Sequence, residues 1–336
     1  MSKEKYLVVR THGLMTHLLS PDKIRSWAMI PDWESLFKEV SSTEYGVFLE
    51  KVDDLRSADK MIDITLRVLS RRVKTFLEVS KGDVVGEAAV RYLAKYDVEN
   101  LKRKVFSLLI RKEGVSEERF LPISGFMINM DPILRASDVN QICDLLPQGR
   151  LRDFILTWLS SSQMNIPLLD IGIDRAYLAE TIAWAEMTKM REVFRIYAEN
   201  YALGVILRSQ LTGVGSELYS SMFEFLSQNV RKVLSESSTF EESLKALLST
   251  EAHKSMASEL MEVYEKYGVP WTLDLSLFKE LYSKIRSLAR MKPFSSIFPF
   301  SYVIAAEWES WAVRTVVLGK LSGIESEKIY DMLSLY

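Results

Sequence analysis

The sequence predicts an all-α fold that is built from three related helical repeats. Glycine and proline are scarce, at 14 and 9 of 336 residues, compared with an average usage of about 7% and 5%, and a shortage of turn formers favours long helices. We find no convincing run of alternating apolar and polar residues, so strands are not expected. In addition, the same helix ending occurs three times along the chain, at spacings that indicate internal repetition.

The recurring ending is an apolar helix that reaches a glycine followed by Val or Ile, and then by Ser and Glu. The three glycines are Gly114, Gly213 and Gly323, which lie 99 and 110 residues apart. Glycine takes the left-handed conformation after a helix at little cost, and basic residues in the last turn complement the helix dipole. Any two helices joined by a glycine turn can look like this, so the prediction depends on the spacing. We place the three repeats at residues 1–113, 114–213 and 214–336.

In the first repeat, apolar periodicity predicts several short helices and one long one. Their expected ranges are 4–19, 22–29, 31–40, a helix that begins at Glu44, and 58–79. Pro21 suits the first turn of a helix, where its missing N–H has no partner to lose, and Lys81 and Gly82 end the long helix. Residues 84–112 form the first of three helices that we call signature helices, because each runs into the recurring ending.

The second and third repeats contain the other two signature helices. The expected helices are 133–145, 150–160, 167–211 as two helices or one kinked helix, 216–234, 239–248, 251–266, 273–291 and 301–321, with a short closing helix after the last glycine. The second signature helix ends at Leu211, and the third follows a loop between Pro293 and Pro299. Because the third is apolar on most sides, we expect neighbours around most of its circumference.

Composition excludes several classes of protein. With 48% hydrophobic residues, including 15 Phe, 14 Tyr and 7 Trp, the chain can bury large cores and is not expected to be disordered. Its 43 basic and 45 acidic residues give a net charge of −2 without a long block of one sign, which argues against nucleic acid as the main partner. The single Cys143 excludes an internal disulfide and fits a reducing cytosol.

Targeting and membrane-spanning segments are not expected either. The chain has no run of 18 apolar residues, which is the length that a helix needs to cross a bilayer. Near the start, Arg10 and His12 interrupt the apolar core that a signal peptide requires.

Motifs for catalysis or cofactor binding are absent or incomplete. No phosphate-binding loop of the form GxxxxGK[ST] occurs, so direct nucleotide binding by that device is not expected. The histidines are scattered and have no cysteine partners, so we predict no zinc site and no other cofactor. Asp53, Asp54 and Asp59 partly resemble the magnesium-binding DDxxD cluster of all-α prenyl-chain enzymes, but the third aspartate comes too late. We therefore expect a non-catalytic protein, with a prenyl-type enzyme as a distant alternative.

The first signature helix carries a continuous polar stripe. At 100° per residue, one sector of the helix holds Asp97, Asn100, Arg103, Lys104, Ser107 and Arg111. Three interpretations are open: a solvated face, salt bridges between neighbouring repeats, or a polar wall that lines a cavity or faces a partner. The corresponding line in the second signature helix, which includes Glu199, is thinner. In the third, one side holds Glu307, Ser310 and Arg314, and Glu309 stands apart.

The segment YDVENLK at 96–102 resembles a motif of the C subunit of the archaeal and bacterial A-type (V/A-type) ATPase, a relative of the d subunit of eukaryotic V-ATPase. Further matches follow in the family order over the whole chain. They are Tyr6 with Arg10, Leu18-Leu19, Thr43-x-Tyr45, Asp174-Arg175-x-Tyr177, Glu307-x-Glu309 before Arg314, Gly319-Lys320 and Gly323-Ile324. Phe106, Glu199 and Ala312 differ from the residues that the family tends to have there, which leaves open whether the motif's polar contacts recur in all three repeats.

The resemblance implies three similar helical bundles around a central funnel with approximate threefold symmetry. It implies a rotor subunit without catalytic residues that holds the foot of the central stalk, made of the D and F subunits, in the funnel. The other side of such a protein rests on the membrane ring of c (proteolipid) subunits, on the cytoplasmic side, and it transmits torque between ATP synthesis or hydrolysis and ion transport. On this basis, the stripe of the first signature helix is our candidate for the wall that contacts the stalk.

A helical-repeat adaptor of another cytosolic complex is the main alternative, because it would share the composition and the repeats. The two functions differ in geometry. A rotor coupling predicts three repeats that close around a cavity, whereas a solenoid adaptor predicts an open concave surface.

Overall fold

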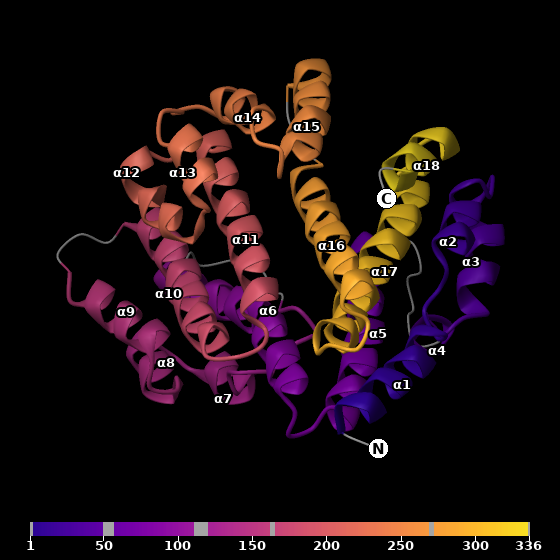
Figure 1. Ribbon diagram of the computed structural model, residues 1–336, viewed down its shortest axis with the longest axis horizontal. Helices are drawn as coiled ribbons and strands as arrows, with labels where there is room; N and C mark the ends of the chain where they lie inside the picture. Colours follow the sequence, from indigo (N-terminus) through magenta and orange to yellow (C-terminus); the bar gives the residue numbers. More distant parts are fainter. Residues whose placement is uncertain (1–2, 50–56, 111–119, 162–164, 269–271, 335–336) are drawn as a thin grey trace. The chain divides into compact units, whose positions relative to one another are not determined.

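The computed structural model describes residues 3–49, 57–110, 120–161, 165–268 and 272–334 (Figure 1). The described residues form helices and connecting turns, with no strand among them, which confirms the predicted all-α fold class. The chain forms two compact units: unit 1 consists of Met1–Asp97, Arg119–Phe126 and Arg286–Tyr336, and unit 2 of Val98–Glu118 and Met127–Ile285. The division into three repeats and the central funnel stay predictions. In the described part of the chain, no helix is long and apolar enough to cross a bilayer.

Unit 1 is organised around α17, the third signature helix. Its helices are α1 (Lys3–Met15), α2 (Pro21–Ala28), α3 (Trp33–Ser41), α4 (Gly46–Leu49), α5 (Ala58–Val79), α17 (Ile297–Leu321) and α18 (Ser326–Ser334), with parts of α6 (Val84–Leu109) and α16 (Leu273–Met291). α17 packs most extensively against α5, and α1, α2, α3 and α18 also contact it. As expected from its apolar sequence, it buries side chains around most of its circumference. Phe76 of α5 stacks on Tyr302 of α17 with ring centroids 5.4 Å apart.

Unit 2 is organised around the hairpin of α10 and α11 (Figure 1). Besides the remaining parts of α6 and α16, its helices are α7 (Met130–Arg135), α8 (Val139–Leu145), α9 (Arg150–Leu159), α10 (Ile166–Glu186), α11 (Arg191–Leu211), α12 (Ser216–Tyr219), the 3-10 helix η1 (Ser220–Phe225), α13 (Gln228–Leu234), α14 (Phe240–Leu248) and α15 (Lys254–Tyr267). Trp184 and Phe194 pack edge to face at the turn of the hairpin, with centroids 5.5 Å apart. Gly172 lets α9 approach α10 closely, because a Cβ at this position would lie 1.9 Å from the Phe154 ring.

The recurring helix ending has the predicted conformation in both copies that the structure describes. Gly213 and Gly323 follow α11 and α17 with φ of +71° and +69°. The backbone bonds that close these endings run from Val214 N–H to Ser209 O and from Ile324 N–H to Gly319 O, at 2.9 and 2.8 Å. This six-residue closure is the Schellman motif, which depends on a left-handed residue at the glycine position. The remaining copy, which is the first along the chain and contains Gly114, lies outside the described residues.

Most helices have bounds close to the expected ones. α5 and α16 span 58–79 and 273–291 as predicted, and the 167–211 segment forms two helices. α1 ends earlier than expected, at Met15, and the Leu19 N–H donates to Glu309 instead of extending the helix. α17 begins earlier than expected, at Ile297, with Pro299 in its first turn, where the missing N–H costs no helix bond.

The single helix predicted over 216–234 is wrong. The chain instead forms α12, η1 and α13. The carbonyls of Glu224 and Leu226 accept hydrogen bonds from the Arg231 guanidinium at 3.1 and 3.4 Å. The Ser227 N–H donates to the Glu199 carboxylate at 2.5 Å. These side-chain contacts engage backbone groups that a continuous helix would pair along its own axis.

Candidate functional site

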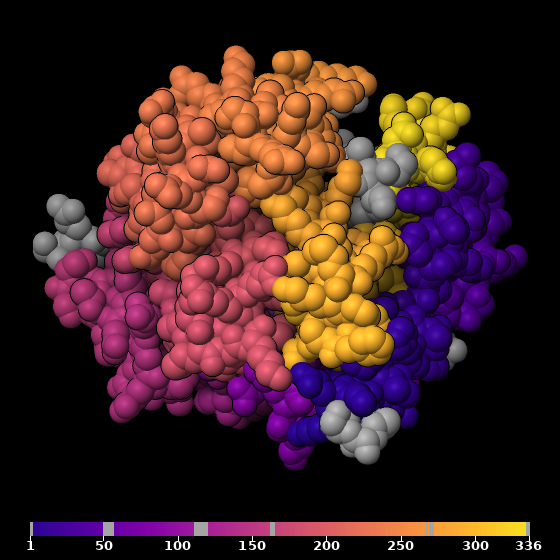
Figure 2. All heavy atoms as spheres, in the orientation of Figure 1, coloured from indigo at the N-terminus to yellow at the C-terminus, as the bar shows by residue number. Residues whose placement is uncertain are grey.

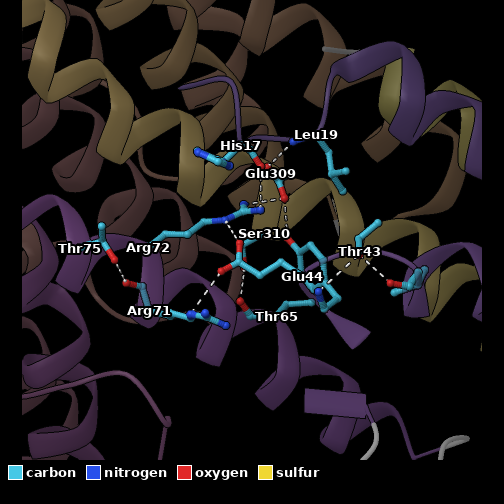
Figure 3. Close-up of polar contacts among 12 residues, drawn as sticks. His17, Leu19, Thr43, Glu44, Thr65, Arg71, Arg72, Thr75, Glu309 and Ser310 are labelled. Atoms are coloured by element: carbon cyan, nitrogen blue, oxygen red, sulfur yellow. Dashed lines mark hydrogen bonds and ion pairs between the residues drawn. The ribbon is translucent and has the colours of Figure 1, made fainter. Parts of the chain in front are cut away.

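The third signature helix carries a buried carboxylate, Glu309, near its middle (Figure 3). A guanidinium nitrogen of Arg72, on α5, lies 2.6 Å from Glu309 Oε1, and the two side chains are 5% and 1% exposed. The Tyr45 hydroxyl donates to Oε1 at 2.9 Å, and the Leu19 N–H donates to Oε2 at 2.8 Å. Glu309 therefore ties α17 to α5, to the residue before α4, and to the segment after α1.

Arg72 is held from a second side by Glu44 (Figure 3). Its Nε donates to Glu44 Oε2 at 2.9 Å, and its Nη2 donates to the His17 carbonyl at 3.4 Å. Burial acts to lower the pKa of Arg72, but the charge of Glu309, the neighbouring Tyr45, and hydrogen bonds to Glu309 and Glu44 together outweigh this effect and raise the pKa above its ordinary value. Burial raises the pKa of Glu309, and Arg72 opposes that shift. Each charge stabilises the other, so loss of one would leave its partner buried.

Ser310 and Arg314 fix the register of α17 against α5. The Ser310 hydroxyl donates to the Thr65 carbonyl at 3.1 Å, and Arg314 Nε donates to the Thr65 hydroxyl at 3.3 Å. The Arg314 guanidinium also lies over the Trp311 ring, 5.0 Å from its centroid. Because both polar groups reach one residue of α5, a shift of either helix by one turn would break both contacts.

Glu307 joins the third signature helix to the first part of α6. Its carboxylate, in a residue that is 2% exposed, accepts hydrogen bonds from the Tyr92 hydroxyl and, at 2.5 Å, from the Tyr96 hydroxyl. Lys95 Nζ lies 2.7 Å from Oε1. Burial lowers the pKa of Lys95, although Glu307 opposes the shift, and burial raises the pKa of Tyr96 well above its ordinary value. Three neighbouring residues of α6 thus surround one carboxylate of α17.

Three residues of the predicted polar stripe on α6 are buried. Asp97, Asn100 and Lys104 are 0%, 1% and 7% exposed. The Asp97 carboxylate accepts the backbone N–H groups of Gly125 and Phe126 at 2.6 and 2.9 Å. A solvated face does not describe these three positions, and Asp97 has an internal role, because it anchors the segment around Gly125 to α6.

The other described members of the stripe are more accessible. The Arg103 side chain is 38% exposed, and its Nε donates to Glu99, one turn earlier, at 2.8 Å. The Ser107 hydroxyl donates to the Lys104 carbonyl within the helix at 2.7 Å. Arg111 lies outside the described residues. Among the charged residues of the stripe that the structure describes, Arg103 is thus the most accessible to a partner.

Lys102, the last residue of the YDVENLK segment, connects α6 to α10. Its Nζ lies 2.8 Å from Asp170 and 2.7 Å from Asp174, and Asp174 also accepts the Tyr201 hydroxyl at 2.8 Å. Burial acts to lower the pKa of Lys102, but the two carboxylates outweigh this effect and raise it. Burial also raises the pKa of Asp174, against the opposing effect of Lys102. The family-motif residue Asp174 therefore lies where α6, α10 and α11 meet.

The two other family-motif residues on α10 lie apart from this cluster of charges. The Tyr177 hydroxyl is 3.0 Å from the Tyr197 hydroxyl of α11, and the pair is buried. Arg175 lies near the surface, where it pairs with Glu224 at 2.7 Å, and the two side chains are about half exposed. Tyr177 therefore packs inside the α10–α11 hairpin, whereas Arg175 does not.

Glu199, on the second signature helix, contacts a buried histidine. His253 Nε2 lies 2.8 Å from Glu199, and His253 Nδ1 lies 2.7 Å from Glu280 of α16. The imidazole is 1% exposed. Burial acts to raise the pKa of Glu199, but hydrogen bonds from His253 and Ser227 outweigh this effect and lower it. His253 immediately precedes α15, so it attaches the start of that helix to α11 and α16.

The second signature helix makes two further polar contacts with α16. The side-chain amide of Asn200 donates to the Leu277 carbonyl at 2.8 Å. Nearer the end of α11, Arg208 forms an ion pair with Asp274. As on α17, a short polar side chain reaches a backbone carbonyl of the neighbouring helix.

For most of these contacts, one of the two partner residues was predicted from the sequence and the other was not. Arg72 and His253 were not predicted as site residues, because nothing in their local sequence indicates a buried partner. Lys102 did have a signal, since it belongs to the motif at 96–102. In the described part of the chain, no group of three or more His, Cys, Asp and Glu side chains could hold a metal ion. Asp53 and Asp54 lie outside the described residues.

Two comparisons with known proteins agree with the resemblance. The model of a family described as the ATP synthase (C/AC39) subunit matches residues 7–332. The C subunit of the A-type ATP synthase of Thermoplasma volcanium is 22% identical over 320 residues, and the match covers 88% of this chain and 89% of that protein. The family match therefore includes all three signature helices.

Proposed function

Because the chain belongs to the ATP synthase (C/AC39) subunit family, we propose that it is the non-catalytic rotor component that couples the central stalk of a V/A-type ATP synthase or ATPase to its membrane ring. Its partners are then the D and F subunits of the stalk on one side and the c (proteolipid) ring on the other, on the cytoplasmic side of the membrane. In this role the protein transmits torque and forms or breaks no covalent bond itself.

The observation that best supports this role is a register that recurs between helices. Asn200 on α11 donates to the Leu277 carbonyl on α16, and Ser310 on α17 donates to the Thr65 carbonyl on α5. Asn200 and Ser310 each lie thirteen residues before the glycine that ends their helix. Leu277 and Thr65 each lie fourteen residues before the last residue of theirs. Equivalent positions of internal repeats would match in this way.

A third pair of helices makes a comparable contact at slightly shifted positions, since Lys102 lies twelve residues before Gly114. Lys102 on α6 contacts Asp170 and Asp174 of α10, which lie on either side of Gly172. The position fourteen residues before the last residue of α10, Glu186, is Gly172, and the two contacts fall two residues to either side of it. In each predicted repeat, the signature helix thus bonds to the helix that precedes the signature helix of the next repeat. The pairs are α6 with α10, α11 with α16, and α17 with α5.

This order of contacts supports a closed cycle of three repeats. In an open solenoid each repeat contacts only its neighbours in the sequence, so the third repeat would not return to the first. The contact of α17 with α5 is such a return, and the buried pair of Arg72 and Glu309 belongs to it. A closed cycle leaves a central space in which an axle can be held, and it resists opening under torque better than an open row does.

We further propose that Arg103 contributes to the contact with the stalk. Arg103→Glu should weaken binding to the D–F complex, measured by biolayer interferometry, with helix content unchanged by circular dichroism. The exchange variant Arg103→Glu with Glu99→Arg is the control, because it keeps an opposite-charge pair within α6. If the exchange restores binding, the internal pair mattered rather than a stalk contact, and Arg103 is not at the interface.

Affinity purification of the tagged chain from native membranes tests the proposed function as a whole. The expected result is co-purification of the catalytic subunits of the ATPase, the D and F subunits, and the c ring in fixed stoichiometry. Recovery of a different cytosolic complex, without ATPase subunits, would favour the helical-repeat adaptor instead.

A further inference from the structure

The turn between α16 and α17 presents large apolar side chains to solvent. All four residues from Met291 to Phe294 are exposed, with 66% exposure for Met291 and 82% for Phe294. The neighbouring helix α1 exposes two more, Tyr6 at 44% and Val9 at 60%. Single exposed apolar residues are normal on proteins, but here they gather on two adjacent segments of unit 1.

Two contacts, one near each end of α1, hold this helix beside the start of α17. The Ser296 hydroxyl donates to the Glu4 carboxylate at 3.4 Å. Further along α1, the His12 ring lies against the Phe298 ring, with centroids 4.5 Å apart. In the sequence of α1, the two exposed apolar residues lie between Glu4 and His12. Figure 2 shows α1, in indigo, adjoining the segment around the turn, in orange-yellow, on the same face of unit 1.

This part of the chain is also basic. The segment 286–306 contains Arg286, Arg290 and Lys292 and no acidic residue, in a chain whose net charge is −2. All three cations are exposed. Within its residues 3–15, α1 contributes three further cations and one carboxylate. The two segments that carry the exposed apolar residues therefore hold six cations and one carboxylate.

The conformation of the turn is fixed by its own hydrogen bonds. Both the N–H and the hydroxyl of Ser295 donate to the Lys292 carbonyl, at 3.1 and 2.7 Å. The Ile297 N–H donates to the Ser295 hydroxyl at 3.3 Å, and Pro293 restricts φ. The exposed side chains therefore sit on a preorganised turn, which lowers the entropy cost of binding.

We propose that this turn, residues 291–294, and the exposed face of α1 enter the headgroup region of an anionic lipid bilayer. Apolar and aromatic side chains flanked by Lys and Arg are the pattern that binds membrane surfaces, where the cations attract anionic lipids and the apolar groups enter below the headgroups. A four-residue turn suits insertion between lipids better than a protein interface, which usually needs about 20–30 residues a side. This contact is made by the chain itself and does not depend on the rotor role.

Vesicle co-sedimentation of the full chain tests the proposal. Wild-type protein should bind vesicles of mixed phosphatidylglycerol and phosphatidylcholine, bind pure phosphatidylcholine much less, and lose binding as salt is raised. The double variant Met291→Glu with Phe294→Glu should bind the anionic vesicles at least roughly tenfold more weakly, because two apolar side chains no longer transfer from water.

Met29→Glu is the matched control. Met29 follows α2, lies outside the α16–α17 turn and is 51% exposed, so the same kind of substitution there should leave vesicle binding unchanged. Equal binding of the wild type and the double variant, or no binding of the wild type to anionic vesicles, would overturn the proposal. A loss that appears only with vesicles containing the c ring would also overturn it, because the turn would then contact protein rather than lipid.

Discussion

The buried pair of Arg72 and Glu309 allows a sharp prediction for a single residue. Glu309→Gln removes a charge that is 1% exposed and leaves Arg72, at 5% exposure, without its closest partner. Breaking a buried pair from one side costs about 3–5 kcal/mol. Because Glu44 still lies 2.9 Å from Arg72, we expect the free energy of unfolding to fall by about 3 kcal/mol, measured by urea denaturation.

A double-mutant cycle provides the control. Arg72→Met together with Glu309→Gln should cost less than the sum of the two single changes, because no unpaired charge remains in the core. Glu241→Gln, which breaks an exposed contact with Lys245 one turn away, should barely change the midpoint of urea denaturation. Additive losses in the double variant would show that the two charges are not coupled.

His253 makes the stability of unit 2 depend on pH. Burial acts to lower the pKa of His253, but hydrogen bonds to Glu199 and Glu280 outweigh it, against opposition from Lys284, and raise the pKa above its ordinary value of 6.5. A raised folded-state pKa means that protonation stabilises the fold. This contribution is complete below pH 6.5 and is lost as the pH rises through the folded-state pKa.

The comparison of wild type with His253→Gln tests this dependence. At pH 6 the free energy of unfolding of the wild type should exceed that of His253→Gln by about 2 kcal/mol, a value within the usual range for a hydrogen bond to a charged group. The difference should shrink as the pH is raised above 6.5. In a Glu199→Gln background the same comparison should vary less with pH, because one of the two partner charges is gone. A difference that stays constant with pH would contradict the role of His253.

At the scale of helices, the close packing of α9 on α10 depends on Gly172. Gly172→Ala places a Cβ 1.9 Å from the Phe154 ring tip, so the ring must move, at a cost of about 1–3 kcal/mol. Phe154→Leu in the same chain should recover part of the loss. Gly13→Ala is the control: it lies within α1 with no atom near the added Cβ, and it should stabilise by about 0.5–1 kcal/mol. Equal effects of the two alanines in thermal unfolding would rule out the steric explanation.

Local sequence signals predicted the helices where local contacts decide the structure. α5 and α16 have the expected bounds because their apolar periodicity and flanking turn residues are local features. The break near Ser227 could not be predicted, since the carboxylate that takes its N–H belongs to Glu199, on another helix. Tertiary contacts of this kind override helical periodicity without leaving a trace in the neighbouring residues.

The candidate site was predictable to the same extent. Motif positions identified Glu307, Glu309 and Asp174, whose carboxylates are all buried and paired. Periodicity placed Asp97 in a polar sector of α6 but could not reveal that backbone N–H groups from a later segment cover it. A helical projection gives the direction in which a side chain points, whereas its partner depends on the packing of distant segments.

For the whole molecule, the comparable contacts of the three helix pairs predict three equivalent hairpins. Their turns carry Lys81 between α5 and α6, Lys189 between α10 and α11, and Lys292 between α16 and α17, and all three are exposed. Cysteine substitutions in pairs, followed by spin labelling, give three distances by pulsed electron paramagnetic resonance. Cys143 is buried, so the introduced cysteines label selectively.

A closed cycle of three repeats requires the three distances to be similar, because each turn then has two equivalent neighbours. In an open row the distance between the outer turns approaches the sum of the other two. The outcome bears directly on mechanism, since a rotor coupling passes torque around the axle through every contact between repeats, including that of α17 with α5. A distance between the outer turns that is close to the sum of the other two distances would contradict the closed cycle, even if the chain co-purified with an ATPase. A row of repeats has no centre in which to hold a stalk.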